Sequence, residues 1–193
     1  MKDAIFRKAR ESADVKLQFV EQNAERVEAC VRALAERFRA GGRLFVMGNG
    51  GSACDAAHVA VEFVHPILER RRPLPALTLG ANTATLTAVG NDSDFARVFE
   101  EQLELLAHPG DAALGISTSG ASANVNRALT CARRKGLLTI GFAGRDGGRM
   151  VAVCDHPFVV ASWSVHRVQE THTLLLHLLW DLVHVALGEE DVL

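Results

Sequence analysis

The sequence predicts an α/β protein with a three-layer αβα sandwich fold, in which a five-stranded parallel sheet lies between helices and N-terminal helices precede it. Two observations predict this class. Short apolar runs alternate with segments that have helical spacing, the pattern of a parallel sheet covered on both faces. Turns rich in glycine or hydroxyl side chains also follow three of these runs, where α/β folds bind their ligands.

Residues 3 to about 40 are predicted to be helical, because "VEACVRALAERFRAGG" has helical spacing and ends in the glycine stop Gly41-Gly42. The five strands are predicted at 43–48, 74–80, 111–117, 137–144 and 156–161. The other helices are predicted at 52–64 with Ser52 as N-cap, at 82–106 as one or two helices around "GNDSD", at 121–135 and at 165–187. No repeat or linker divides the chain, so we expect a single domain over residues 1–193.

The composition is that of an ordinary globular protein, with 48% hydrophobic and 23% charged residues. A formal net charge of −2 argues against nucleic acid or another polyanion as a partner. The longest apolar stretch, "TLLLHLLWDLVHVAL", is interrupted by His177, Asp181 and His184 and is too short to cross a membrane. The N-terminus lacks an apolar signal region. The four cysteines show no C-x-x-C spacing, so we expect reduced thiols and a cytoplasmic protein.

Two common phosphate-binding loops are excluded by their missing partners. "GNGGSA" has dinucleotide-type spacing at Gly48, Gly50 and Ala53, but the next strand ends in "TLGANT" without the acidic residue that binds a ribose. "GISTSGAS" has Walker-type spacing, but Ala121 stands where the lysine should be. We therefore expect neither a dinucleotide nor a nucleoside triphosphate.

A smaller anion fits the third turn better. "GISTSGAS" places Ser117, Thr118, Ser119 and Ser122 between a strand and a helix, where backbone N–H groups already favour a phosphate. Hydroxyl groups add neutral donors that can hold a phosphate monoester without a lysine. The alternative is that these residues only form turns and cap the helix. Four hydroxyls at the carboxyl edge of a parallel sheet favour anion binding.

Two helices carry candidate catalytic side chains. His58 and Glu62 are four residues apart and share one helix face, with Cys54 one turn earlier. The apolar flank "VAVEFV" suggests that Glu62 is partly buried, as suits a general base, although a solvated pair is equally compatible with the pattern. In the last helix Gln169 and His177 are eight residues apart, about 12 Å along the axis. For His172 and His184 we favour a core or surface role.

The motifs taken together resemble one known family. "GNGGSACDAAHVAVE", "VGND", "GISTSGASANV", "GRDGGRM" and "RVQETHTLLLH" occur in the order found in phosphoheptose isomerases, which are sugar isomerase (SIS) domain proteins with a flavodoxin-like sheet. The resemblance spans essentially the whole chain. It implies interconversion of sedoheptulose 7-phosphate and D-glycero-D-manno-heptose 7-phosphate through an enediol, for the biosynthesis of lipopolysaccharide core or another glycan.

The resemblance also implies roles for individual residues. The phosphate would be held by Ser52, Ser117, Thr118, Ser119 and Ser122. The sugar would be contacted by Asn49, Gly50, Gly51, Glu62, Asn91, Asp92 and Gln169. Glu62 would be the general base and His177 its acid–base partner. One zinc ion per subunit would be bound by His58, Glu62, Gln169 and His177, and no nucleotide cofactor is implied. The family forms homotetramers with sites at subunit interfaces, so residues 1–40 would be a helical extension used in oligomer packing.

Three segments depart from the family pattern: His166 replaces an aspartate, residues 64–73 replace a Gly-Arg-Tyr/Phe segment, and "GNDSDF" differs at its end. They bear on the identity of the sugar more than on the reaction. Two other classes remain as alternatives: a non-catalytic SIS protein that binds a sugar phosphate or a replication-initiator partner, and a sugar-phosphate sensor. The presence of all four candidate zinc ligands argues for the enzyme. A sensor would normally carry a helical DNA-binding domain, and the N-terminal segment is too short and too weakly basic for one.

Overall fold

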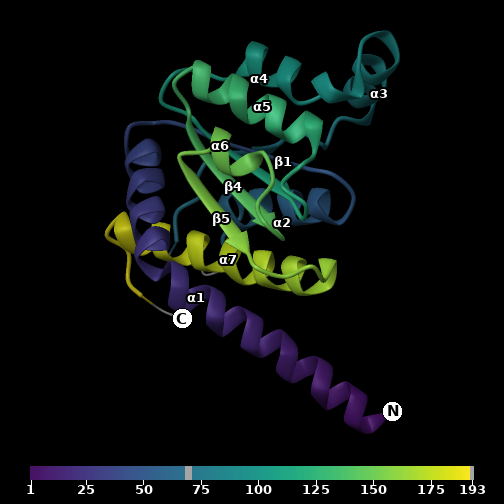
Figure 1. Cartoon of the computed structure of the whole chain (residues 1–193). Coiled ribbons are helices and arrows are strands. Elements are labelled where there is room, and N and C mark those ends of the chain that lie inside the picture. The colour runs from purple at the N-terminus through teal and green to yellow at the C-terminus, as the bar shows by residue number, and fades with distance from the viewer. Residues whose placement is uncertain (68–70, 192–193) are drawn as a thin grey trace.

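The computed structural model describes residues 1–67 and 71–191 and has the predicted three-layer architecture (Figure 1). One sheet has the strand order β2-β1-β3-β4-β5, and all neighbouring strands are parallel. Its strands are β1 (Leu44–Gly48), β2 (Ala76–Thr78), β3 (Ala112–Ser117), β4 (Leu138–Gly144) and β5 (His156–Val160). The helices are α1 (Lys2–Arg39), α2 (Gly51–Val64), α3 (Thr83–Asp92), the 3-10 turn η1 (Phe95–Arg97), α4 (Glu100–Leu106), α5 (Ala123–Arg134), α6 (Met150–Val153) and α7 (Val165–Ala186).

The sheet is covered on both faces. The central strands β1, β3 and β4 are buried along their whole length, whereas the edge strands β2 and β5 are partly exposed. Figure 1 shows α1, α2 and α7 on one face and α3, α4 and α5 on the other, and each set forms its own buried apolar cluster with the sheet. Burial from both sides explains why these strands appear in the sequence as continuous apolar runs.

Helix α1 has 38 residues and two different halves. Its buried residues all lie between Phe19 and Phe38, where it packs against α7 and the sheet. Its first turns extend away from the body of the molecule (Figure 1) and expose Ile5 and Phe6. The long N-terminal helical prediction is therefore confirmed, and half of that helix lies largely outside the core of its own chain.

Two details differ from the sequence prediction. Strand β2 covers only Ala76–Thr78 of the predicted 74–80, because it is an edge strand that pairs with β1 alone and follows Pro75, which has no N–H to donate. The short helix α6 was not predicted, since four residues give too little periodicity to detect. All four cysteines are free thiols, as expected. None of the helices in the described part of the chain has both the length and the apolar character needed to cross a membrane.

A core or surface role was expected for His172 and His184, and both are fully buried in the core. The His172 Nε2–H donates to the carbonyl oxygen of Ala143 on β4 at 3.1 Å. Burial lowers the pKa of His172 to about 4, although the hydrogen bond to Ala143 opposes this effect. His172 is therefore neutral at physiological pH and ties α7 to the centre of the sheet.

We predict that His172 makes the protein less stable in mild acid. Its folded-state pKa is below that of the unfolded chain, so the unfolded state binds more protons between about pH 6.5 and 4 and stability falls as the pH falls. Urea unfolding at pH 7.5 and pH 5 should show that wild type loses about 2 kcal/mol more than His172→Asn, whose amide does not titrate. Equal losses in the two proteins would contradict this assignment.

Candidate active site between helices α2 and α7

The turns after β1 and β3 meet at the carboxyl edge of the sheet, where the sequence places the phosphate site. The Asn49 Nδ2 donates to Asn124 Oδ1 at 2.8 Å, and the Asn124 Nδ2 donates back to Asn49 Oδ1 at 2.8 Å. Asn49 follows β1 and Asn124 lies in the first turn of α5, so this reciprocal amide pair fixes the two turns together. Asn124 is a buried residue that the sequence analysis did not single out, because an asparagine at a helix start suggests only capping.

The structure brings together three of the four hydroxyls in the turn after β3. The Oγ atoms of Ser117 and Ser122 are 2.9 Å apart, and those of Ser117 and Ser119 are 3.5 Å apart. Ser119 Oγ also accepts a hydrogen bond from the backbone N–H of Ala121. Ser122 is the N-cap of α5, yet its side chain makes no capping bond. Hydroxyls that converge on one another at a helix N-terminus form a small cradle of donors suited to an anion.

Glycine allows this turn to pack closely against the turn after β4. Gly120 has φ +63°, and a Cβ added to it would lie 2.0 Å from the carbonyl oxygen of Gly147. The Gly120 carbonyl oxygen accepts from the backbone N–H of Met150 at 3.1 Å and from Asn126 Nδ2 at 2.9 Å. The motif "GRDGGRM" therefore packs against the hydroxyl turn and hydrogen-bonds to it through Met150.

Ser52 is not the N-cap of α2, so this prediction was wrong. Gly50, with φ +56° and ψ −126°, occupies the cap position, and the helix begins at Gly51. The paired glycines let the chain turn directly into the helix, and the backbone N–H of Ser52 bonds to the Asn49 carbonyl. Ser52 is buried in the first turn. Its predicted role in binding phosphate is unaffected and stays a prediction.

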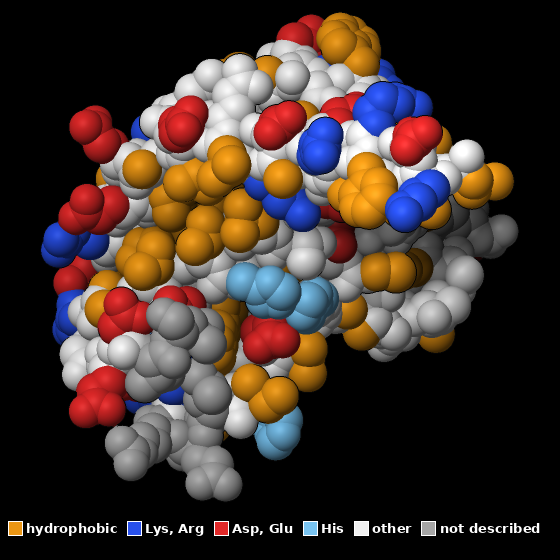
Figure 2. Space-filling view, turned by 90° about the horizontal axis from the view of Figure 1, so that it is seen from below, with side chains coloured by type: hydrophobic (Ala, Val, Ile, Leu, Met, Phe, Trp, Pro, Cys, Tyr) orange, Lys and Arg blue, Asp and Glu red, His pale blue; other side chains and the backbone are white. Residues whose placement is uncertain are grey.

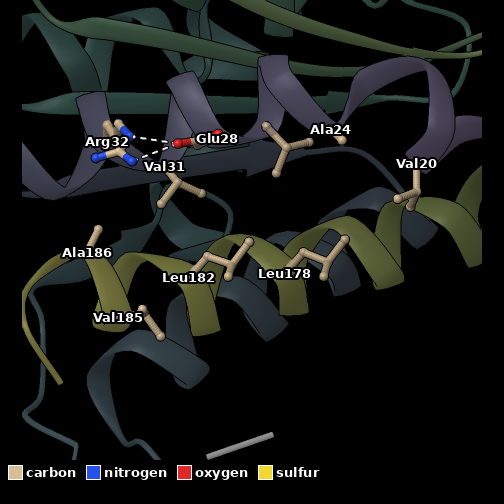
Figure 3. Close-up of a pocket in the computed structure, with 10 residues that line it drawn as sticks. Val20, Ala24, Glu28, Val31, Arg32, Leu178, Leu182, Val185 and Ala186 are labelled. Atoms are coloured by element: carbon tan, nitrogen blue, oxygen red, sulfur yellow. Dashed lines mark hydrogen bonds and ion pairs between the residues drawn. The ribbon is translucent and has the colours of Figure 1, made fainter. Parts of the chain in front are cut away.

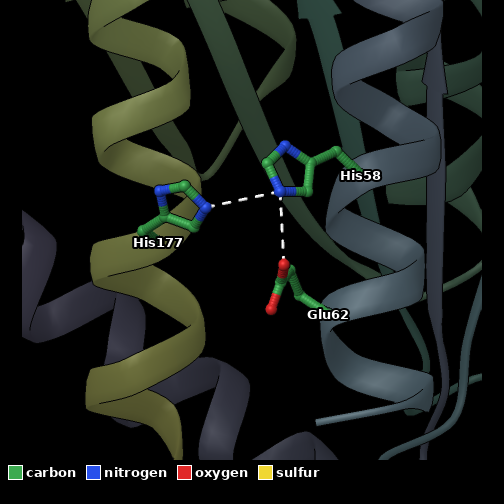
Figure 4. Close-up of side chains that lie close together, drawn as sticks. All are labelled: His58, Glu62 and His177. Atoms are coloured by element: carbon green, nitrogen blue, oxygen red, sulfur yellow. Dashed lines mark hydrogen bonds and ion pairs between the residues drawn. The ribbon is translucent and has the colours of Figure 1, made fainter. Parts of the chain in front are cut away.

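His58, Glu62 and His177 come together at the contact between α2 and α7 (Figure 4). His58 Nε2 lies 3.2 Å from Glu62 Oε1 and 3.3 Å from His177 Nε2. The two imidazole rings meet edge to face, with centroids 4.9 Å apart. The side chains of Glu62 and His58 are 23% and 37% exposed, and His177 is exposed, so the cluster is partly buried on α2 and open to solvent on α7. Figure 2 shows histidine side chains gathered beside acidic and hydrophobic ones on this face.

The chemistry of these side chains fits a divalent metal. One ligand atom from each of His58, Glu62 and His177 lies within 4.8 Å of the others. Two imidazole nitrogens and one carboxylate oxygen form a donor set typical of zinc sites that keep a position open for substrate. The three ligand atoms lie this close although His177 follows His58 by 119 residues in the chain.

Gln169 lies elsewhere on the same helix pair. A Cβ added to Gly51 would be 2.2 Å from Gln169 Nε2, so the amide lies directly over the first turn of α2. His177 is about two turns further along α7, roughly 12 Å by helical rise. The structure therefore unites three of the four predicted ligands and places the fourth beside the glycine turn, where the sugar was expected. Its role as a metal ligand stays a prediction.

The remaining predicted residues are less closely associated with this cluster. Thr118 is half-buried in the hydroxyl turn. Asn91 and Asp92 are exposed at the end of α3, and the Asn91 Nδ2 donates to Asp92 Oδ1 at 2.6 Å. His166 is exposed in the first turn of α7. Of the divergent segment 64–73, residues 68–70 lie outside the described residues.

Asp55 is a further polar residue near the cluster that the sequence analysis missed. Its Oδ2 atom is buried and has no hydrogen-bond partner among the described residues. Burial raises the pKa of Asp55, and the nearby His58 partly opposes this shift. The only sequence signal was its position three residues before His58 on the same helix.

The chain is similar to known proteins in sequence and in fold. The SIS domain family model matches residues 9–144. A phosphoheptose isomerase from Aquifex aeolicus is 44% identical over 182 residues, covering 94% of this chain and 95% of that protein. One from Trichlorobacter lovleyi is 49% identical, with 88% of each chain covered.

Solved structures of two such enzymes superpose over nearly the whole chain. The phosphoheptose isomerase from Neisseria gonorrhoeae has a TM-score of 0.88 at 34% identity, covering 94% of this chain and 97% of that one. The enzyme from Francisella tularensis has a TM-score of 0.90 at 30% identity, with 95% and 97% covered. These matches cover nearly the whole chain, α7 included, so they extend beyond residues 9–144 that the family model matches. The chain belongs to the phosphoheptose isomerase family of SIS-domain proteins.

Proposed function

We propose that the protein is an aldose–ketose isomerase that converts sedoheptulose 7-phosphate to D-glycero-D-manno-heptose 7-phosphate for heptose biosynthesis. The single observation that carries this proposal is the meeting of His58 and Glu62, on the helix that begins at the glycine turn, with His177 on α7. The family membership and the relatives named phosphoheptose isomerase support it. A non-catalytic binding protein is not favoured, because it would not need this cluster.

The site has a phosphate end and a reaction end. The converging Ser117, Ser119 and Ser122 hydroxyls would bind the phosphate together with Ser52. Ser52 and Glu62 are ten residues apart on α2, about 15 Å by helical rise. An extended sugar phosphate and a glutamate side chain can bridge this span together. The separation therefore suits a long sugar bound by its terminal phosphate.

The reaction needs only proton transfers. The Glu62 carboxylate would take a proton from C1 of the ketose, and the C1–H electron pair would form the C1=C2 double bond of the enediol. Glu62 would return the proton to C2, while His177 would move a proton from O1 to O2, leaving the aldehyde at C1. No atom is gained or lost, so no redox cofactor is needed. Zinc bound by His58, Glu62 and His177 would stabilise negative charge on the substrate oxygens.

Loss of the Glu62 carboxylate should abolish this chemistry. In Glu62→Gln, kcat should fall by at least about 100-fold, because an amide cannot accept the C1 proton. The aldose product would be followed by NMR with purified protein and sedoheptulose 7-phosphate. Glu104→Gln, which changes an exposed glutamate on α4, is the matched control and should keep wild-type kcat. Full activity in Glu62→Gln would show that another group is the base.

The hydroxyl turn should determine phosphate affinity. Ser119→Ala combined with Ser122→Ala should raise KM for the sugar phosphate by about tenfold or more, since two donors are lost, each worth about 1 kcal/mol. The same variant should bind unphosphorylated sedoheptulose as wild type does. Unchanged affinity for the phosphorylated sugar would refute the phosphate assignment.

Metal removal should inactivate the enzyme reversibly. Chelation should abolish turnover and added zinc should restore it, because zinc would stabilise charge on the substrate oxygens. His58→Gln should lower the zinc content of the purified protein, whereas His65→Gln, at the exposed C-cap of α2, should not. Turnover that survives complete metal removal would keep the isomerase and refute the zinc proposal.

We also propose that the protein is a homotetramer of the cytoplasm, and that α1 forms part of the subunit interface. A groove of about 530 Å³ runs between α1 and α7 (Figure 3). It is lined mainly by apolar side chains: Val20, Ala24, Val27, Val31, Leu178, Leu182, Val185 and Ala186. The outer half of α1 exposes further apolar side chains that an oligomer would cover. The four free cysteines are in keeping with a reducing compartment.

A charge in this groove should disrupt the oligomer. Leu182→Glu should reduce the mass measured by sedimentation velocity from tetramer to dimer or monomer, because an unpaired carboxylate would be buried. Leu105→Glu, at an 80% exposed leucine on α4, is the matched control and should leave the mass unchanged. A tetramer that persists in Leu182→Glu would place the interface elsewhere.

A further inference from the structure

A buried ion pair joins the segment after α2 to α7. Arg71 Nη2 lies 2.5 Å from Asp181 Oδ1, and Arg71 Nη1 donates to the Asp181 carbonyl oxygen at 3.0 Å. The two side chains are only 2% and 13% exposed. Arg71 Nη2 also donates to the carbonyl oxygen of Glu190 at 3.3 Å, so one guanidinium group ties the α2–β2 connection to both α7 and the C-terminal residues.

This pair lies one helical turn beyond the proposed active site. Asp181 and His177 are four residues apart and therefore share a face of α7. Arg71 follows α2, the helix that carries His58 and Glu62. The contacts of Arg71 therefore reach α7 at Asp181, and Asp181 lies one turn along α7 from His177.

Aromatic contacts make the junction compact. The guanidinium carbon of Arg71 lies 4.8 Å from the centre of the Trp180 ring. Phe63, next to Glu62 in the chain, stacks on His184 with centroids 6.3 Å apart and an interplanar angle of 27°. Trp180 in turn meets His184 with ring centroids 5.4 Å apart. Ring contacts thus connect Arg71 to Phe63 on α2, and a movement of α7 along its axis would disturb several of them at once.

Stability alone does not explain a charged pair in this position. Replacing a buried ion pair with packed apolar residues is often neutral or stabilising, because both charges pay a desolvation cost. The pair is also incompletely satisfied: among the described residues, Arg71 Nε and the neighbouring Trp180 Nε1 are buried without hydrogen-bond partners. The pair instead contributes geometric specificity. The Arg71 guanidinium bonds to both the side chain and the backbone of Asp181, and these bonds together fix the position of Asp181.

We propose that Arg71 is a positioning residue for the reaction, acting through Asp181 to hold α7 in the register that brings His177 to His58 and Glu62. The proposal rests on the proposed function. His177 Nε2 lies 3.3 Å from His58 Nε2, and a slip of α7 by one residue would move it by about 1.5 Å. Misplacement on that scale is enough to cost two orders of magnitude in rate.

The test uses three variants and one matched control. Arg71→Lys keeps the charge but removes the planar fork, and Asp181→Asn removes the anion. The double change Arg71→Met with Asp181→Leu replaces the pair by apolar side chains and protects against unfolding from an unpaired buried charge. The control is Asp111→Asn, whose buried carboxylate pairs with Arg43 at the amino edge of the sheet, just before β1 and β3. Each full-length protein is measured for kcat, KM, urea stability and, after metal removal, the dissociation constant of Co²⁺ by absorption.

All three variants should lose at least about tenfold in kcat, with KM for the sugar phosphate changed less than about twofold, because the phosphate turn is distant. Their Co²⁺ dissociation constants should rise at least about tenfold, and the double variant should do so while remaining as stable as wild type. Asp111→Asn should lose stability but keep both kcat and Co²⁺ affinity.

Wild-type kcat and Co²⁺ affinity in the folded double variant would overturn the positioning role. The positioning role would also be overturned if Asp111→Asn lost as much kcat and Co²⁺ affinity as Asp181→Asn. Such losses would result from lower stability and not from a changed register of α7. Absence of turnover in the wild-type protein would overturn the proposed function separately. In that case Co²⁺ affinity alone would still decide whether Arg71 sets the geometry of the cluster.

Discussion

The proposed active site depends on one packing constraint: α2 and α7 lie side by side and run in the same direction. Gln169 contacts Gly51 near the start of both helices, His177 meets His58 near the middle, and His184 stacks on Phe63 near the end. Both helices lie on the same face of a parallel sheet, so both run back from its carboxyl edge. This parallel contact brings together groups from opposite halves of the chain.

The same constraint separates the two tasks of the site. The starts of the helices lie at the glycine and hydroxyl turns, where backbone N–H groups favour an anion. The reactive side chains lie two turns further along, in a place sheltered by α2 and open beside α7. A substrate held at the first place by its phosphate would present its far end at the second. The distance along α2 between the two places would thus select substrates by their length.

The sequence predicted the fold and the position of the hydroxyl turn at the carboxyl edge of the sheet, because both depend on local patterns. The alternation of apolar runs and helices specifies a parallel sheet, and the turns after β1 and β3 must then share one edge. The sequence could not predict which side chains hydrogen-bond between these two turns, such as Asn49 and Asn124, because an amide pair leaves no periodic signal. The N-cap at Ser52 was wrong because Gly50 and Gly51 permit a tighter turn than the usual cap rule assumes. The Arg71–Asp181 pair was also hidden, since an arginine in a run of arginines suggests a solvated surface.

Proton transfer by Glu62 through an enediol is the central claim, and the fate of one hydrogen atom tests it most directly. The protein would be incubated with sedoheptulose 7-phosphate in deuterium oxide, and C2 of the aldose product examined by NMR. The account predicts that solvent deuterium appears at C2, because the proton held by Glu62 exchanges with solvent during some turnovers. An aldose product whose C2 carries the hydrogen that was on C1 of the ketose, with no deuterium even after prolonged incubation at equilibrium, would indicate hydride transfer and contradict the account.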